Sequence, residues 1–169
     1  MVVYLIASMS KNGIICVSNH STHFRAKWFE MNTVKGAIVM GHKTWESLGP
    51  FPNCTNIIIS RQYNHSPTST VEWCTTISEA IDIAGPNQNV YIIGGSEIFH
   101  SALLLELVDA CMLTYVDVTV AKQSTVSLPV RKVAWTSEQF SHAGVSFHFE
   151  LSVVKKKGFL PGFQYKTAR

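Results

Sequence analysis

Residues 36–49 read GAIVMGHKTWESLG, an apolar run that ends in glycine and leads into a helix-like stretch. The apolar part is short and continuous, which is typical of a strand covered on both faces in a parallel sheet. Gly41 ends this strand, the potentially cationic His42 and Lys43 follow, and Thr44 stands where the next helix should begin. Backbone N–H groups at a helix start, aided by the helix dipole, bind phosphate. The stretch therefore predicts an α/β sheet with an anion site at one edge.

The same arrangement recurs further along the chain. Residues 89–98 read NVYIIGGSEI, again a strand, two glycines and a helix start, although the full G-x-G-x-x-G pattern is absent. Between the two stretches, TNIII is followed by Ser60 and Arg61, a hydroxyl and a guanidinium suited to a phosphate monoester. Each segment alone also fits an ordinary capped helix or turn. Because ligands bind beyond the carboxyl ends of strands in open α/β sheets, the three together predict one extended phosphorylated ligand, such as a dinucleotide.

The other periodic segments fit a single-domain α/β fold with a mixed, mostly parallel sheet and flanking helices. Thr76, with Glu79 three residues later, is a capping-box pattern that predicts a helix start. Segments 133–140 and 145–153, separated by a short turn around Gly144, predict an antiparallel hairpin at a sheet edge. Strands are expected at 2–8, 36–41, 55–60, 89–95 and 110–116, and helices at 24–33, 78–84 and 96–108.

Composition limits the class of protein. The 169 residues are 46% apolar and 15% charged, which excludes a disordered chain and predicts one domain over residues 1–154 with a basic extension over 155–169. The net charge of +3 falls short of that of a dedicated nucleic-acid binder, so a nucleic-acid partner is not expected. The four cysteines form no C-x-x-C pair, and no metal site is expected. No apolar run approaches the roughly 18 residues of a membrane span, and no signal peptide is recognised, so we expect a cytoplasmic protein without a membrane partner. The oligomeric state stays open.

Six segments of the chain form an ordered set: LIA at 5–7, WF at 28–29, MGHKTWESLG at 40–49, NIIISR at 56–61, IIGGSEIF at 92–99 and LTYV at 113–116. With these segments in this order, the chain resembles the dihydrofolate reductase family. The segments that carry the resemblance occur in the family's order over about residues 2–151. The resemblance implies a mixed sheet with a C-terminal antiparallel hairpin, and an NADPH-dependent reduction of 7,8-dihydrofolate, or a related pterin, to the tetrahydro form.

The resemblance also implies which residues bind the cofactor. Ala7 and Ile15 would line the nicotinamide, and Gly94 and Gly95 would form a cis Gly-Gly turn over the pyrophosphate. Ser60 and Arg61 match the clamp on the 2′-phosphate that selects NADPH over NADH. The remaining positions implied by the resemblance are His42, Lys43 and Thr44 on the phosphates, with Ser96 and Glu97 at the helix start.

The substrate half departs from the family pattern. The family places a carboxylate three residues before the Trp-Phe pair, where it binds the pterin and promotes protonation at N5, and here that position is Arg25. No Asp or Glu precedes Phe29, so a shift of register does not restore the acid. Cys54 stands where the family has the arginine that grips the substrate's glutamate carboxylate. The catalytic group is therefore unknown. The positions that the resemblance leaves for a pterin are Ile6, Phe29, Leu48, Phe51, Ile93 and, as support for the missing acid, Thr114.

Two alternatives stay open. Loss of the acid and of the carboxylate clamp also fits a non-catalytic module of this family with a structural or assembly role, or a reductase of a different heterocyclic substrate. Retention of Ser60 and Arg61 favours an enzyme, because a purely structural descendant has no use for a phosphate clamp. The loop before Phe24 is shorter than in the family. Either Arg25 faces the pterin pocket, or this loop has rotated the helix and left Arg25 exposed.

Overall fold

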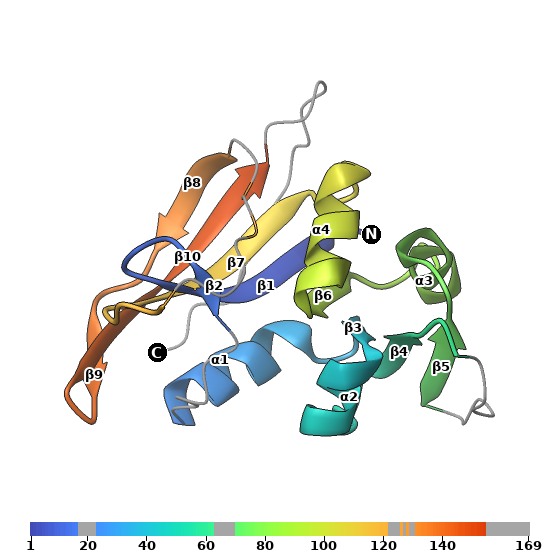
Figure 1. The fold of residues 1–169 in the computed structure, drawn as a ribbon, viewed down its shortest axis with the longest axis horizontal. Helices are drawn as coiled ribbons and strands as arrows, with labels where there is room; N and C mark the ends of the chain where they lie inside the picture. The colour runs from blue at the N-terminus through green and yellow to red at the C-terminus, as the bar shows by residue number, and fades with distance from the viewer. Residues whose placement is uncertain (17–22, 63–69, 122–125, 127, 129–130, 155–169) are drawn as a thin grey trace. The chain divides into compact units, whose positions relative to one another are not determined.

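A computed structural model describes residues 1–16, 23–62, 70–121, 126, 128 and 131–154 (Figure 1). The expected extension 155–169 and the loop 17–22 lie outside the described residues. The chain divides into two compact units, Met1–Ile6 with Thr33–Val108, and Ala7–Asn32 with Asp109–Arg169.

In chain order the elements are β1 Val3–Ser10, β2 Ile15–Cys16, α1 His23–Thr33, β3 Ala37–Gly41, α2 His42–Leu48, β4 Thr55–Ile59, β5 Val71–Cys74, α3 Ile77–Ala84, β6 Val90–Gly94, α4 Ser96–Leu104, β7 Ala110–Val116, β8 Arg131–Thr136, β9 Phe140–His142 and β10 Val145–Val154.

The first unit is built on a parallel sheet. Its strands follow the order β5-β4-β3-β6-β1, and every neighbouring pair in this series is parallel. Helix α3 packs on β4 and β5, and α4 packs on β6 and β3. Ile38, Ile57 and Ile92, one from each central strand, are fully buried. The expected α/β class with a mainly parallel sheet and flanking helices is therefore confirmed, and so are the five strands expected at 2–8, 36–41, 55–60, 89–95 and 110–116.

The second unit is antiparallel. Strand β10 pairs with β7 on one side and with β8 on the other, while β9 also pairs with β10. The predicted hairpin turn at Gly144 is confirmed, and both Ala143 and Gly144 have a positive φ there. The expected first arm 133–140 is wrong in detail, because it forms two strands, β8 and β9. Between them, the Ser137 side chain takes a place in the ladder: its hydroxyl oxygen accepts from the Phe149 N–H at 2.9 Å.

Helix boundaries differ from the expected ones at two places. Helix α4 ends at Leu104 instead of residue 108, because Glu106 has a φ of 52° and the chain turns, with the Leu107 N–H donating to the Ala102 carbonyl at 3.0 Å. Helix α2 begins at His42 and not at Thr44. The capping residue of α3 is as predicted, since the Thr76 hydroxyl accepts from the Glu79 N–H at 3.1 Å.

Candidate functional site

Three loops that were predicted to hold phosphate follow neighbouring strands of the first unit. Strand β3 pairs in parallel with both β4 and β6, and its residues Gly41 and Met40 lie opposite Ile59 and Gly94 respectively. Because the strands run the same way, the residues after these three strand ends share one edge of the sheet. This set, Gly41–Thr44, Ser60–Arg61 and Gly94–Glu97, is named the carboxyl-edge cluster. The structure thus brings together the predicted phosphate-binding segments.

The glycine pair of the cluster leaves room for a ligand. The Gly94–Gly95 peptide bond is cis, which confirms the expectation from the resemblance. Gly94 has a φ of 114°, and a Cβ there would lie 3.0 Å from the Phe99 ring, so this position requires glycine. At Gly95 φ is −72°, and the nearest atom to an added Cβ would be Thr44 Oγ1, at 3.8 Å. The protein therefore leaves the space beside Gly95 open, as a closely approaching phosphate requires.

Helix α2 begins with His42 and Lys43, the potentially cationic side chains of the carboxyl-edge cluster. His42 is half-buried, and its Nε2 lies 3.7 Å from Glu46 Oε1, one helical turn away. The His42 ring also packs edge-on against Trp73, with 5.6 Å between centroids. Lys43 is exposed, and it forms no ion pair within the described ranges. Of the two, Lys43 is the permanent cation that is available to a phosphate.

Ser60 and Arg61 have different surroundings. Ser60 is buried, and its hydroxyl both accepts from the Gln62 N–H at 3.2 Å and donates to the Gln62 carbonyl at 3.1 Å. Its hydroxyl therefore shapes the turn. Arg61 is exposed, and its Nη2 donates to Glu97 Oε2 at 3.0 Å. Arg61 is thus the member of the predicted clamp that presents charge to solvent.

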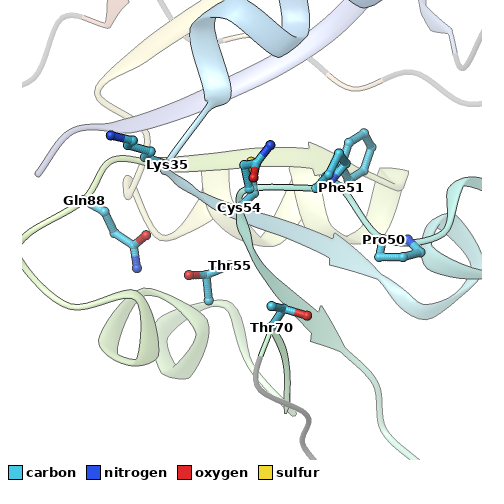
Figure 2. A pocket seen from close by; sticks show the side chains of 9 residues that line it. Lys35, Pro50, Phe51, Cys54, Thr55, Thr70 and Gln88 are labelled. Atoms are coloured by element: carbon cyan, nitrogen blue, oxygen red, sulfur yellow. The ribbon is translucent and has the colours of Figure 1, made fainter.

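Phe51 and Cys54 lie beside a hollow at the amino ends of the same parallel strands, away from the carboxyl-edge cluster (Figure 2). Buried Asn56 fixes the turn, because it accepts from the Phe51 N–H at 2.9 Å and donates to the Phe51 carbonyl at 3.0 Å. The Cys54 thiol lies 3.4 Å from the Thr33 carbonyl and supplies no cation. The hollow has a volume of about 460 Å³ and is lined by Lys35, Pro50, Phe51, Pro52, Asn53, Cys54, Thr55, Thr70 and Gln88.

The other predicted substrate residues of the first unit lie on β1, β6 and α2. Ile6 and Ile93 come directly after Leu5 and Ile92, the last residues paired between β1 and β6. Ile6 is buried and Ile93 is half-buried. Leu48, the last residue of α2, is 55% exposed, so about half of its surface is open to solvent.

Predicted residues of the second unit lie on β1, β2, α1 and β7. Ala7 is buried on β1, and Ile15 lies on β2, opposite Met9 of β1. Thr114 is buried on β7, opposite Phe149 of β10. Trp28 of α1 stacks on the same Phe149, with 4.5 Å between ring centroids, and half-buried Phe29 follows it.

Arg25 lies in the first turn of α1, where the structure describes the backbone alone. Positions three and four residues apart share a helix face, so position 25 belongs to the face of Trp28 and Phe29. Trp28 is 3% exposed, which makes this the inner face of the helix. Lys27 and Glu30 are exposed. Position 25 therefore lies one turn before Trp28, and its assignment to the pterin pocket stays a prediction.

The sequence did not predict the role of Trp73, which packs against the start of α2. Trp73 lies on β5, a strand of four residues that was too short to predict. It contacts His42 edge-on and also Trp45, at 6.3 Å between centroids. The stretch VEWC is too short for an alternation to show in the sequence, although Val71 and Trp73 are both buried. Burial raises the pKa of the next residue, Cys74, to about 12, so this thiol stays protonated and is not a nucleophile.

The described residues contain neither a metal-binding cluster nor a helix that could span a membrane. No group of three or more His, Cys, Asp or Glu side chains lies close enough there to hold a metal ion. Every helix in the same part of the chain falls short of the length and apolar character needed to cross a membrane.

Comparison with known proteins identifies the family. A family model described as dihydrofolate reductase matches residues 2–151. The dihydrofolate reductase of Buchnera aphidicola subsp. Acyrthosiphon pisum is 35% identical over 125 residues, which cover 71% of this chain and 75% of that protein. The dihydrofolate reductase of Haemophilus influenzae is 34% identical over 108 residues, or 61% of this chain and 66% of that protein. A bifunctional dihydrofolate reductase-thymidylate synthase of Paramecium tetraurelia is 28% identical over 163 residues, or 86% of this chain and 33% of that protein. The chain, with its cis Gly-Gly turn at the edge of a parallel sheet, belongs to the dihydrofolate reductase family.

Proposed function

We propose that this chain is an NADPH-dependent oxidoreductase that reduces 7,8-dihydrofolate, or a related pterin, to the tetrahydro form by hydride transfer. Membership of the family implies a nicotinamide cofactor and a folate substrate in general. The observation that carries the finer proposal is the carboxyl-edge cluster, where Lys43, Arg61 and the open position at Gly95 follow three adjacent parallel strands.

The donor groups of the cluster fit the phosphates of a dinucleotide. Arg61 offers a planar fork of N–H donors that matches a phosphate monoester. Helix α4 begins after Gly95 without a side-chain cap, so its first N–H groups are available to an anion. When bound, the nicotinamide supplies the hydride. The chain's own residues hold the phosphates, while Ala7 and Ile15 are proposed to line the nicotinamide.

The site lacks the carboxyl group that promotes protonation of the pterin in the family, because Arg25 stands at that position. An arginine stays protonated and offers only donors, so Arg25 cannot serve as a general acid as a carboxyl group does. General acid–base assistance is typically worth about 10²–10⁴ in rate. We therefore expect the chain to bind NADPH and to reduce dihydrofolate slowly.

The test is a titration of the chain with NADPH and with dihydrofolate, followed by absorbance decay of the pair. Binding of both and measurable decay support the proposed reductase. Binding of NADPH without decay for any pterin would favour the non-catalytic module. A chain that binds neither ligand would contradict the proposal altogether.

Arg61→Ala is expected to weaken NADPH binding by at least about tenfold and to leave NADH binding nearly unchanged. Charge-assisted hydrogen bonds contribute about 1.5–3 kcal/mol, and about 1.4 kcal/mol is a tenfold change in affinity. The dissociation constants of both cofactors, measured by protein fluorescence, check this. Lys132→Ala, which removes an exposed cation from β8, is the control. Equal losses for NADPH and NADH would contradict the clamp at Arg61.

The remaining expectations rest on the sequence. The cytoplasmic location, the absence of a nucleic-acid or metal partner and the division at residue 154 stay predictions. The site residues also stay proposals.

A further inference from the structure

The Glu97 carboxylate forms an ion pair with the Arg61 guanidinium, which is the group proposed to bind the 2′-phosphate of NADPH. Arg61 follows β4, and Glu97 lies in the first turn of α4, 36 residues later in the sequence. Arg61 Nη2 and Glu97 Oε2 are 3.0 Å apart, and the two side chains are 86% and 84% exposed. The pair is therefore formed in solvent, on the open side of the carboxyl-edge cluster.

A carboxylate and a phosphate compete for the same donors. An ionised carboxylate has acceptor atoms only, so the Glu97 side chain has no hydrogen to give to a phosphate. Both groups are anionic, and a phosphate that reaches Arg61 must either displace the carboxylate or lie beside it. Either event opposes phosphate binding, because an opposite-charge contact is lost or a like-charge contact is made.

We propose that Glu97 is a specificity-determining residue that competes with the 2′-phosphate for Arg61 and so limits the preference for NADPH over NADH. This inference rests on the proposed function, since it concerns the same cofactor site. It also revises the sequence expectation that Glu97 binds the cofactor: the α4 backbone at this position suits a phosphate, whereas the side chain opposes one.

The ion pair between Arg61 and Glu97 can be replaced by a contact between Arg61 and a phosphate. An ion pair between exposed side chains is weak and is screened by salt, so an incoming phosphate can break it. The Glu97 side chain is largely free of the protein around it, while its carbonyl accepts from the Ser101 hydroxyl at 2.9 Å inside the helix. A Glu97→Gln substitution keeps the length and the backbone contact and removes only the charge.

The experiment compares the wild type with Glu97→Gln and with Glu106→Gln, a matched charge change just beyond the carboxyl end of α4. Dissociation constants are measured for NADPH, NADH and adenosine 2′-monophosphate at low salt and at about 1 M salt, where the Debye length is about 3 Å. We expect Glu97→Gln to tighten NADPH and adenosine 2′-monophosphate roughly two- to fivefold at low salt, as exposed pairs allow. NADH binding should not change, the gain should shrink at high salt, and Glu106→Gln should match the wild type.

A double-mutant cycle completes the test. In an Arg61→Ala background, Glu97→Gln should change the dissociation constant of NADPH much less, because the guanidinium for which the carboxylate and the 2′-phosphate compete is then absent. If wild-type NADPH binding is normal and Glu97→Gln leaves it unchanged or weakens it, the inference is overturned while the proposed function stands. If neither form binds NADPH or adenosine 2′-monophosphate, both are overturned.

Discussion

Arg25→Asp is expected to raise the turnover of dihydrofolate by on the order of 10²-fold, the lower end of what general acid–base assistance typically contributes. The new carboxyl group would restore a partner for the donor edge of the pterin, and the rate would then depend on the ionisation of that group. The wild type should lack such a carboxylate-dependent pH profile. Steady-state rates across the pH range, for the wild type, Arg25→Asp and Arg25→Glu, measure both effects.

The control for this prediction lies on the same helix. Lys27→Asp makes the same change of charge at an exposed position of α1, and it should leave both the rate and its pH dependence unchanged. Position 25 lies one helical turn before Trp28, whose ring is stacked on Phe149. Fast wild-type turnover that is insensitive to both Arg25 substitutions would refute the assignment of position 25 to the pterin pocket.

Gly95→Ala is expected to weaken NADPH binding by on the order of a hundredfold without unfolding the protein. A methyl group at this position would meet nothing in the protein closer than Thr44 Oγ1, at 3.8 Å, so the clash must come from the bound phosphates. Overpacking costs about 1–3 kcal/mol, and about 1.4 kcal/mol is tenfold in affinity. Cofactor titration and thermal unfolding of the same variant separate binding from stability.

Gly94→Ala provides the contrast for that measurement. Gly94 has a φ of 114° and would place a Cβ 3.0 Å from the Phe99 ring, so its substitution should lower the melting temperature. Gly95→Ala should melt like the wild type. If Gly95→Ala binds NADPH normally, the assignment of this turn to the pyrophosphate is wrong.

The successes of the sequence interpretation come from local signals. Short apolar runs rich in β-branched residues identified β3, β4 and β6, because a strand covered on both faces needs an apolar residue at nearly every position. Thr76 was found because a capping residue must precede the first helical turn it satisfies. The two- and four-residue strands β2 and β5 carry too few positions for a period to show.

By itself the sequence determined the α/β class, the glycine turn after β6 and the absence of a carboxyl group at position 25, since each depends on residues that are adjacent in the chain. Only the tertiary structure decided which side chains meet. In the folded chain the Ser60 hydroxyl bonds to Gln62 within its own turn, and the first arm of the hairpin forms two strands. Arg61 pairs with Glu97, 36 residues away in the sequence. The physical reason is that parallel strands bring together residues separated by whole helices, and a local pattern carries no record of the partner that lies across the sheet.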